Sequence, residues 1–64
     1  MIIRVDATWN GSRDGHGFRL TMPDGRRESI RGEAWTRRTA SEALDIIEKV
    51  YHIERGAVRF DVHA

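Results

Sequence analysis

The feature that most constrains this chain is a change in the spacing of its apolar residues. Near the start apolar and polar residues alternate, and the apolar positions are Ile3, Val5, Ala7 and Trp9. Alternation with a period of two residues is typical of a strand that buries one face. Over residues 36–53 the apolar residues instead recur every three or four positions, the spacing of one face of an α-helix. The spacing therefore predicts a sheet with a helix packed on it.

A second alternating run extends the predicted sheet. Phe18, Leu20 and Met22 share one face of this run, and a glycine-containing turn at residues 10–15 separates it from the first run. It ends at a proline-aspartate-glycine sequence, residues 23–25, where proline fixes one turn residue and glycine allows a positive φ. These residues predict a hairpin that leads into a third strand.

The third strand is expected from about Arg27 to Trp35. Ile30 defines its inward parity, and that parity alone would point Trp35 to solvent. We expect a bulge at Gly32 to reset the register, because a buried tryptophan adds much to the core of so small a domain.

The predicted helix, Thr36–Ile53, carries a capping-box sequence in which Thr39 precedes Glu42 by three residues. Gly56 is the expected stop signal after the helix. A last alternation over residues 58–62 predicts a fourth strand. The apolar stripe of the helix is predicted to consist of Ala40, Ala43, Leu44, Ile47, Val50 and Tyr51.

The expected fold class is α+β with element order β-β-β-α-β in a single domain, residues 1–64. A three-stranded antiparallel meander, followed by a helical crossover that returns a parallel fourth strand, gives sheet order 3-2-1-4 with the helix on one face. A chain of 64 residues buries only about 60% of its unfolded surface. We therefore expect a homodimer that pairs edge strands or packs a spare apolar side chain such as Ile2 or Trp35.

Composition narrows the class of protein further. The chain has no cysteine, so disulfides and thiolate metal sites are excluded, and it has no apolar run that approaches a membrane span. We expect a cytoplasmic protein without membrane contact. His16, His52 and His63 lack the spacing of metal ligands, and no phosphate-binding loop or nucleophile elbow occurs. We expect no cofactor.

Arginine is the most prominent charged residue. The formal net charge is only +1, so binding to a polyanion would require the arginines to be concentrated on one face. Strand parity predicts such a face, opposite the helix, and arginine can contact phosphate with two parallel hydrogen bonds. The alternative is an ordinary solvated face whose charges protect the sheet from aggregation. The candidate residues for nucleic-acid or partner binding are Arg4, Arg19, Arg27, Arg31 and Arg59.

Three carboxylates suggest a different chemistry. Asp6, Glu42 and Asp61 resemble, in order and spacing, the metal-binding carboxylates of ribonuclease H, and the stretch TRRTASEAL resembles the part of that family with the helix glutamate. Parity places both aspartates on the open face, opposite the helix with Glu42, whereas a two-metal site needs carboxylates that converge. We therefore expect no catalytic site and no metal site.

The stretch GFRLTMPDGRRESIRGEAWTRRTASEAL resembles two groups of small modules that share a three-stranded meander followed by a helix, and the resemblance covers about residues 15–50. The first is the YegP-like family, in which G-E-G-Y and S-S-K stand where this chain has residues 32–35 and 36–38. The second is the arm-type DNA-binding domain at the N-terminus of tyrosine recombinases, which generally stops after the helix, whereas this chain continues into a fourth strand. The opening stretch IIRVDATW is also similar to the first strand of HicB-type antitoxins, which have a partial ribonuclease H fold.

Together these resemblances imply a binding module without catalysis. We expect it to bind nucleic acid, in the first place DNA, through the arginine-bearing open face. The alternative is a protein-binding adaptor or inhibitor of the phage or toxin-antitoxin type, which would use the same face or an exposed edge strand.

Overall fold

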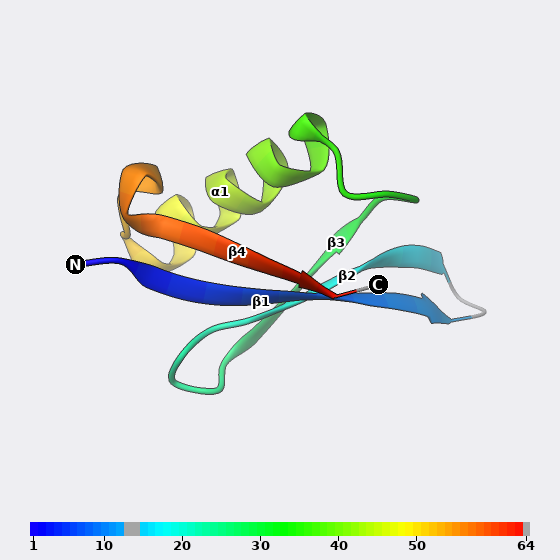
Figure 1. Ribbon diagram of the computed structural model, residues 1–64, viewed down its shortest axis with the longest axis horizontal. Coiled ribbons are helices and arrows are strands. Elements are labelled where there is room, and N and C mark those ends of the chain that lie inside the picture. Colours follow the sequence, from blue (N-terminus) through cyan, green and yellow to red (C-terminus); the bar gives the residue numbers. More distant parts are fainter. Residues whose placement is uncertain (13–14, 64) are drawn as a thin grey trace.

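The computed structural model describes residues 1–12 and 15–63 as one sheet with one long helix (Figure 1). The elements are β1 (Ile3–Ser12), β2 (Gly15–Thr21), β3 (Arg27–Arg31), α1 (Arg37–Tyr51), the 3₁₀ turn η1 (Arg55–Ala57) and β4 (Val58–His63). The sheet order is β3-β2-β1-β4; β2 is antiparallel to both its neighbours and β4 is parallel to β1. The predicted α+β fold with order 3-2-1-4 is confirmed.

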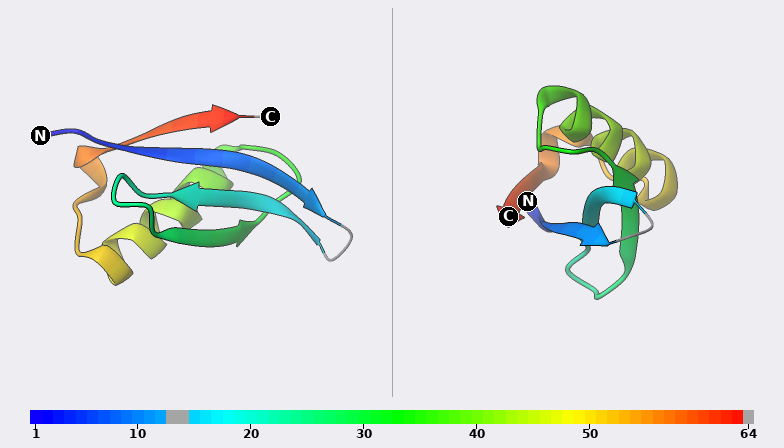
Figure 2. Two further views of the ribbon diagram at one scale, coloured as in Figure 1. Left: turned by 90° about the horizontal axis from the view of Figure 1, so that it is seen from below. Right: turned by 90° about the vertical axis from the view of Figure 1, so that its right-hand side faces the viewer.

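The helix covers one face of the sheet and leaves the other face open (Figure 2). Inward residues of β1 and β2, such as Val5 and Leu20, are completely buried, as are Ala43 and Ile47 of α1. The core between the two layers contains Val5, Ala7, Phe18, Leu20, Met22, Ile30, Ala43 and Ile47. Strand alternation therefore separates a dry face from a wet face, as predicted.

The first two strands extend further than the sequence suggests. β1 continues to Ser12 and β2 begins at Gly15, so most of the expected turn at residues 10–15 is strand. Its centre, residues 13–14, lies outside the described residues.

Strand β3 is shorter than predicted, and this difference brings Trp35 onto the core. The expected strand to Trp35 with a bulge at Gly32 is wrong, because β3 ends at Arg31 and the chain turns toward the helix. The indole of Trp35 then packs edge-on between the rings of Phe18 and Phe60, with centroid separations of 5.2 and 5.0 Å. Trp35 is thus half-buried, by a bend in the chain rather than by a bulge.

The helix begins at a cap one turn earlier than the predicted capping box. Thr36 is the N-cap, and its hydroxyl oxygen accepts a hydrogen bond from the backbone N–H of Thr39 at 3.3 Å. The Thr39 hydroxyl is buried and donates to the carbonyl of Ala34 at 2.8 Å. Glu42 lies near Arg38 at 3.7 Å instead of reaching back to the helix start. The capping-box prediction is therefore wrong.

The helix also ends before the glycine that was expected to stop it. His52 is the C-cap, with φ of 58° and ψ of 38°, and its N–H donates to the carbonyl of Glu48. Gly56 lies beyond this point, in η1. One member of the predicted stripe, Val50, is 50% exposed, whereas Ile46, outside that stripe, packs against the core. The buried face is thus rotated slightly from the predicted one.

Candidate nucleic-acid interface

The open face of the sheet carries all five predicted site arginines. Each of them is exposed and alternates with residues that point toward the helix layer. Four of these arginines come from the three strands before the helix, and the fifth comes from the strand after it. β1 contributes Arg4, β2 contributes Arg19, β3 contributes Arg27 and Arg31, and β4 contributes Arg59.

The open face has two halves that differ in charge, one formed by β2 and β3 and the other by β1 and β4. On the half formed by β2 and β3, Arg19 is directly opposite Ser29, and Arg27 is opposite Thr21. Arg27 is therefore a strand residue of the open face. Arg31 is opposite Gly17, which presents no side chain beside it. This half carries guanidinium groups, hydroxyls and a glycine, and none of its residues is acidic.

The half formed by β1 and β4 is mixed in charge. Arg4 lies opposite Arg59, and Asp6 lies opposite Asp61 in the next outward row. Like charges directly opposite each other destabilise a strand pair. The imidazole Nε2 of His63 is 3.3 Å from Asp6 Oδ1, so one of the two carboxylates has a polar neighbour. The positive field of the open face is consequently strongest over β2 and β3.

Several arginines outside the open face form ion pairs. Arg26 contacts Asp24 at 2.6 Å, Arg38 contacts Glu42 at 3.7 Å, and Arg55 contacts two carboxylates of α1. Within residues 1–12 and 15–63, no ion pair involves any of the five open-face arginines. Their guanidinium groups retain their hydrogen-bond donors for a ligand or for water.

The carboxylates that resemble those of ribonuclease H do not converge. Asp6 and Asp61 are neighbours on the open face, whereas Glu42 lies on α1 beyond the sheet, where it faces Arg38. In the part of the chain that the structure describes, no three acidic, histidine or cysteine residues form a group able to hold a metal ion. The three positions share an order along the chain and not a site.

The three histidines are also separate. The ring of His16 stacks on Trp9, with centroids 5.9 Å apart and planes 9° apart. His52 ends the helix, and His63 lies beside Asp6. Each has a local structural contact of its own.

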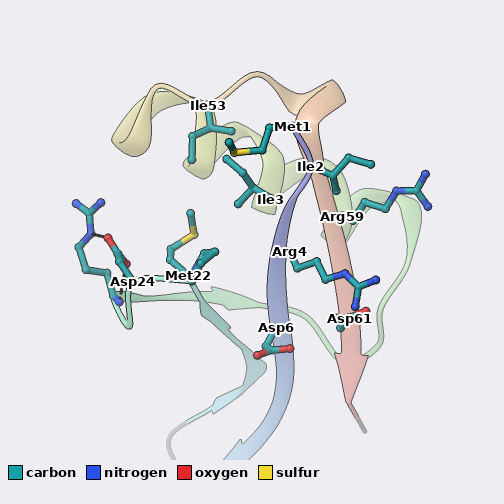
Figure 3. A pocket seen from close by; sticks show the side chains of 12 residues that line it. Met1, Ile2, Ile3, Arg4, Asp6, Met22, Asp24, Ile53, Arg59 and Asp61 are labelled. Carbon is teal, nitrogen blue, oxygen red and sulfur yellow. Dashed lines mark hydrogen bonds and ion pairs between the residues drawn. The ribbon is translucent and has the colours of Figure 1, made fainter.

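A groove lies at the β1–β4 end of the open face, where Arg4 and Arg59 are among its lining residues, and sequence patterns did not reveal it. β1 begins at Ile3, whereas β2 ends at Thr21, which lies opposite Asp6, so within the described residues the start of β1 has no paired residue on β2. The resulting hollow has a volume of about 880 Å³, and apolar side chains of Ile3, Met22 and Ile53 line it (Figure 3). The groove exists because β1 and β2 end at different places in space, which a sequence does not show. The one sequence feature that could have suggested it is the run of apolar residues at positions 1–3.

Two groups near this groove have shifted pKa values. The pKa of the Asp24 carboxyl is lowered because it accepts hydrogen bonds from the backbone N–H and then the side-chain Nε of Arg26. The pKa of the Tyr51 phenol is raised by desolvation and by the hydrogen bond that it donates to Glu28 at 2.9 Å. The guanidinium of Arg26 lies 4.5 Å from the centre of the Tyr51 ring. These contacts hold the β2–β3 turn against the end of α1.

Comparisons of the chain with models of protein families, with curated proteins and with solved structures give no match. None of the helices in the described ranges combines the length and apolar character needed to cross a bilayer.

Proposed function

We propose that this protein is a non-catalytic nucleic-acid-binding module whose open face contacts phosphates of duplex DNA. The observation that supports this most is the set of five exposed guanidinium groups, drawn from every strand and without ion-pair partners among the described residues. Arginine is suited to phosphate because its planar fork donates two parallel hydrogen bonds. A sheet can also lie along a DNA groove.

Three of these groups form the centre of the proposed interface. Arg19, Arg27 and Arg31 lie on two adjacent antiparallel strands with hydroxyls and a glycine between them. Strands are about 4.8 Å apart, and alternate residues along a strand are about 6.7 Å apart, so the three groups span several phosphates. Arg4 and Arg59 extend the contact to the far side of the sheet, past the two aspartates.

Salt dependence of binding is the first test. Fluorescence anisotropy with a labelled duplex should show affinity that falls steeply as salt rises from about 50 to 200 mM. Each neutralised phosphate contributes about −0.9 to the slope of log K against log salt, so five contacts limit the slope to about −4.5. Absence of binding at the lowest salt would refute the proposal.

A charge reversal with a matched control locates the binding face. Arg19→Glu should reduce the affinity about tenfold or more, because it removes one phosphate contact and adds a repulsive charge. Arg37→Glu makes the same change in net charge on the helix layer, where an acid in the first turn suits the helix dipole. It should change the affinity much less. Equal losses from the two variants would show that binding does not use the open face.

A second candidate function is a protein-binding adaptor or inhibitor of the phage or toxin-antitoxin type. The apolar groove beside β1 favours it, because exposed apolar surface with a polar rim is typical of protein contacts. Pull-down with mass determination of the complex, using wild type and Arg19→Glu, separates the two functions. In a protein that never binds DNA, a stable protein complex would favour the adaptor: its loss in Arg19→Glu would place the contact on the open face, and its retention would place the contact at the groove, which Arg19 does not line.

A further inference from the structure

The two edges of the sheet differ in whether they can pair with another strand. β3 and β4 are the outer strands, and Figure 2 shows β4 with no element of the described chain beyond it. An open edge presents unpaired backbone N–H and C=O groups, which natural proteins usually protect with lysine, proline or a bulge. β4 has the sequence VRFDVH, which contains no lysine or proline, and its two charged side chains, Arg59 and Asp61, have opposite signs and can attract those of a second copy.

The residues of β4 complement themselves in one antiparallel register. When Phe60 lies opposite Phe60 of a second copy, Arg59 lies opposite Asp61 of that copy, and the reverse pair also forms. On the helix side, Val58 lies opposite Val62 of the second copy. Val62 is 43% exposed in the single chain, so this register covers an exposed apolar side chain. Opposite charges and β-branched side chains in facing positions stabilise strand pairs.

Neighbouring registers lack this complementarity. A register centred on Arg59 or on Asp61 places identical charges face to face. A shift by one residue places inward side chains opposite outward ones and sends the two helices to opposite sides of the sheet. Of these registers, only the one centred on Phe60 places opposite charges face to face and keeps both helices on the same side of the sheet.

The pairing within one chain gives an independent reason for this contact. Arg59 is directly opposite Arg4 across the β1–β4 ladder, and Asp61 is directly opposite Asp6. Each is therefore beside a like charge on its inner side. An opposite charge on the free side, supplied by a second copy, would compensate both of these pairs.

The other edge is unsuited to self-pairing. The register that uses all of β3 is centred on Ser29 and places Arg27 opposite Arg31 of the second copy, twice. These like charges protect the β3 edge in the usual way.

We propose that the free edge of β4 pairs antiparallel with β4 of a second copy, centred on Phe60, to form a continuous eight-stranded sheet. The two helices then lie on one side, and the two open faces join on the other. Five facing residue pairs form a contact smaller than a standard interface of about 1,600 Å², so the dimer dissociates on dilution. The pairing itself does not depend on nucleic-acid binding; only the use of the joined face rests on the proposed function.

Sedimentation over a concentration series, without nucleic acid, tests the pairing. The mass should rise from 7.4 kDa toward twice that value as concentration increases. Arg59→Asp or Asp61→Arg alone should weaken the dimer about tenfold, because each variant creates two like-charge pairs. Either variant also removes a like-charge neighbour inside its own chain, so both should remain folded by circular dichroism. The double variant, with both changes, should dimerise as wild type does.

Arg31→Asp is the matched control at the other edge. It should leave the dimer constant unchanged, whereas a dimer built on β3 would become tighter. A monomer at all concentrations, a tighter dimer in this control, or a folded double variant that stays monomeric would overturn the proposal. Failure of DNA binding would not affect the sedimentation result, because the dimer is measured without nucleic acid. The DNA-binding proposal is tested separately with Arg19→Glu, and Arg19 lies on β2, away from the β4 edge.

Discussion

Replacement of Trp35 by alanine tests how the end of the sheet is held together. The indole lies between two rings in edge-on contact, at 5.2 Å from Phe18 on β2 and 5.0 Å from Phe60 on β4. Since β1 lies between these strands, Trp35 connects elements that are not hydrogen-bonded to each other. Truncation would remove both contacts and leave the two rings partly uncovered.

The expected loss is large for a chain of this size. Removal of a buried tryptophan or phenylalanine side chain costs about 3–5 kcal/mol, and half-burial lowers this figure. Two aromatic contacts contribute about 0.5–1.5 kcal/mol each beyond the buried area. We expect a loss of about 3 kcal/mol in the free energy of unfolding. A chain of 64 residues has a total of about 3–10 kcal/mol, so the variant should be at the limit of stability.

Urea unfolding followed by circular dichroism measures this loss. The midpoint for Trp35→Ala should fall markedly, and Trp35→Phe should retain part of the stability because it keeps an aromatic ring. Val50→Ala is the control: Val50 is 50% exposed on α1, and its removal should change the free energy of unfolding by less than about 0.5 kcal/mol. An unchanged midpoint for Trp35→Ala would contradict the packing of Trp35 on the core.

Three further outcomes follow from local geometry. Gly17→Ala should lower the free energy of unfolding by about 1–3 kcal/mol, because an added Cβ would lie 2.2 Å from the carbonyl oxygen of Ile30; a stability equal to wild type in thermal melts would contradict this close approach. Thr36→Ala should lower the free energy of unfolding by about 1 kcal/mol, because it removes the N-cap hydrogen bond. Helix content and melting temperature measure the change, and an effect no larger than that of Ser41→Ala would contradict the assignment of the cap. The pKa of Tyr51 is higher in the folded chain than in the unfolded chain, where it is about 10. Tyr51 therefore makes its full contribution to the free energy of unfolding below that pH, and the contribution is lost as pH rises through the higher pKa of the folded chain. Wild type should therefore lose stability in alkali more steeply than Tyr51→Phe in urea titrations at several pH values, and parallel pH profiles would exclude this linkage.

The candidate site was predictable to the extent that it depends on parity. Side chains of a strand alternate between faces, so the exposure of Arg4, Arg19, Arg31 and Arg59 on one face could be expected from their positions alone. That these arginines have no ion-pair partner within residues 1–12 and 15–63 could not be expected, because it depends on where carboxylates from other elements lie. The groove beside β1 was unpredictable for a similar reason. It forms because β1 and β2 differ in length and are paired only from Asp6 onward, and neither strand's own sequence shows how the two are paired.

The sequence by itself determined the element order, the sheet order and the separation of wet and dry faces, because all three follow from periodicity and from the short connections between elements. Tertiary structure decided the element ends. Thr39 carries a capping sequence, yet its hydroxyl is drawn into the core to meet Ala34, and Thr36 takes over the cap. Trp35 reaches the core because β3 ends early and the chain bends toward the aromatic rings of other strands. Local patterns describe what each segment favours, whereas the end of β3 and the bend at Trp35 depend on the burial of aromatic rings that come from segments distant in sequence.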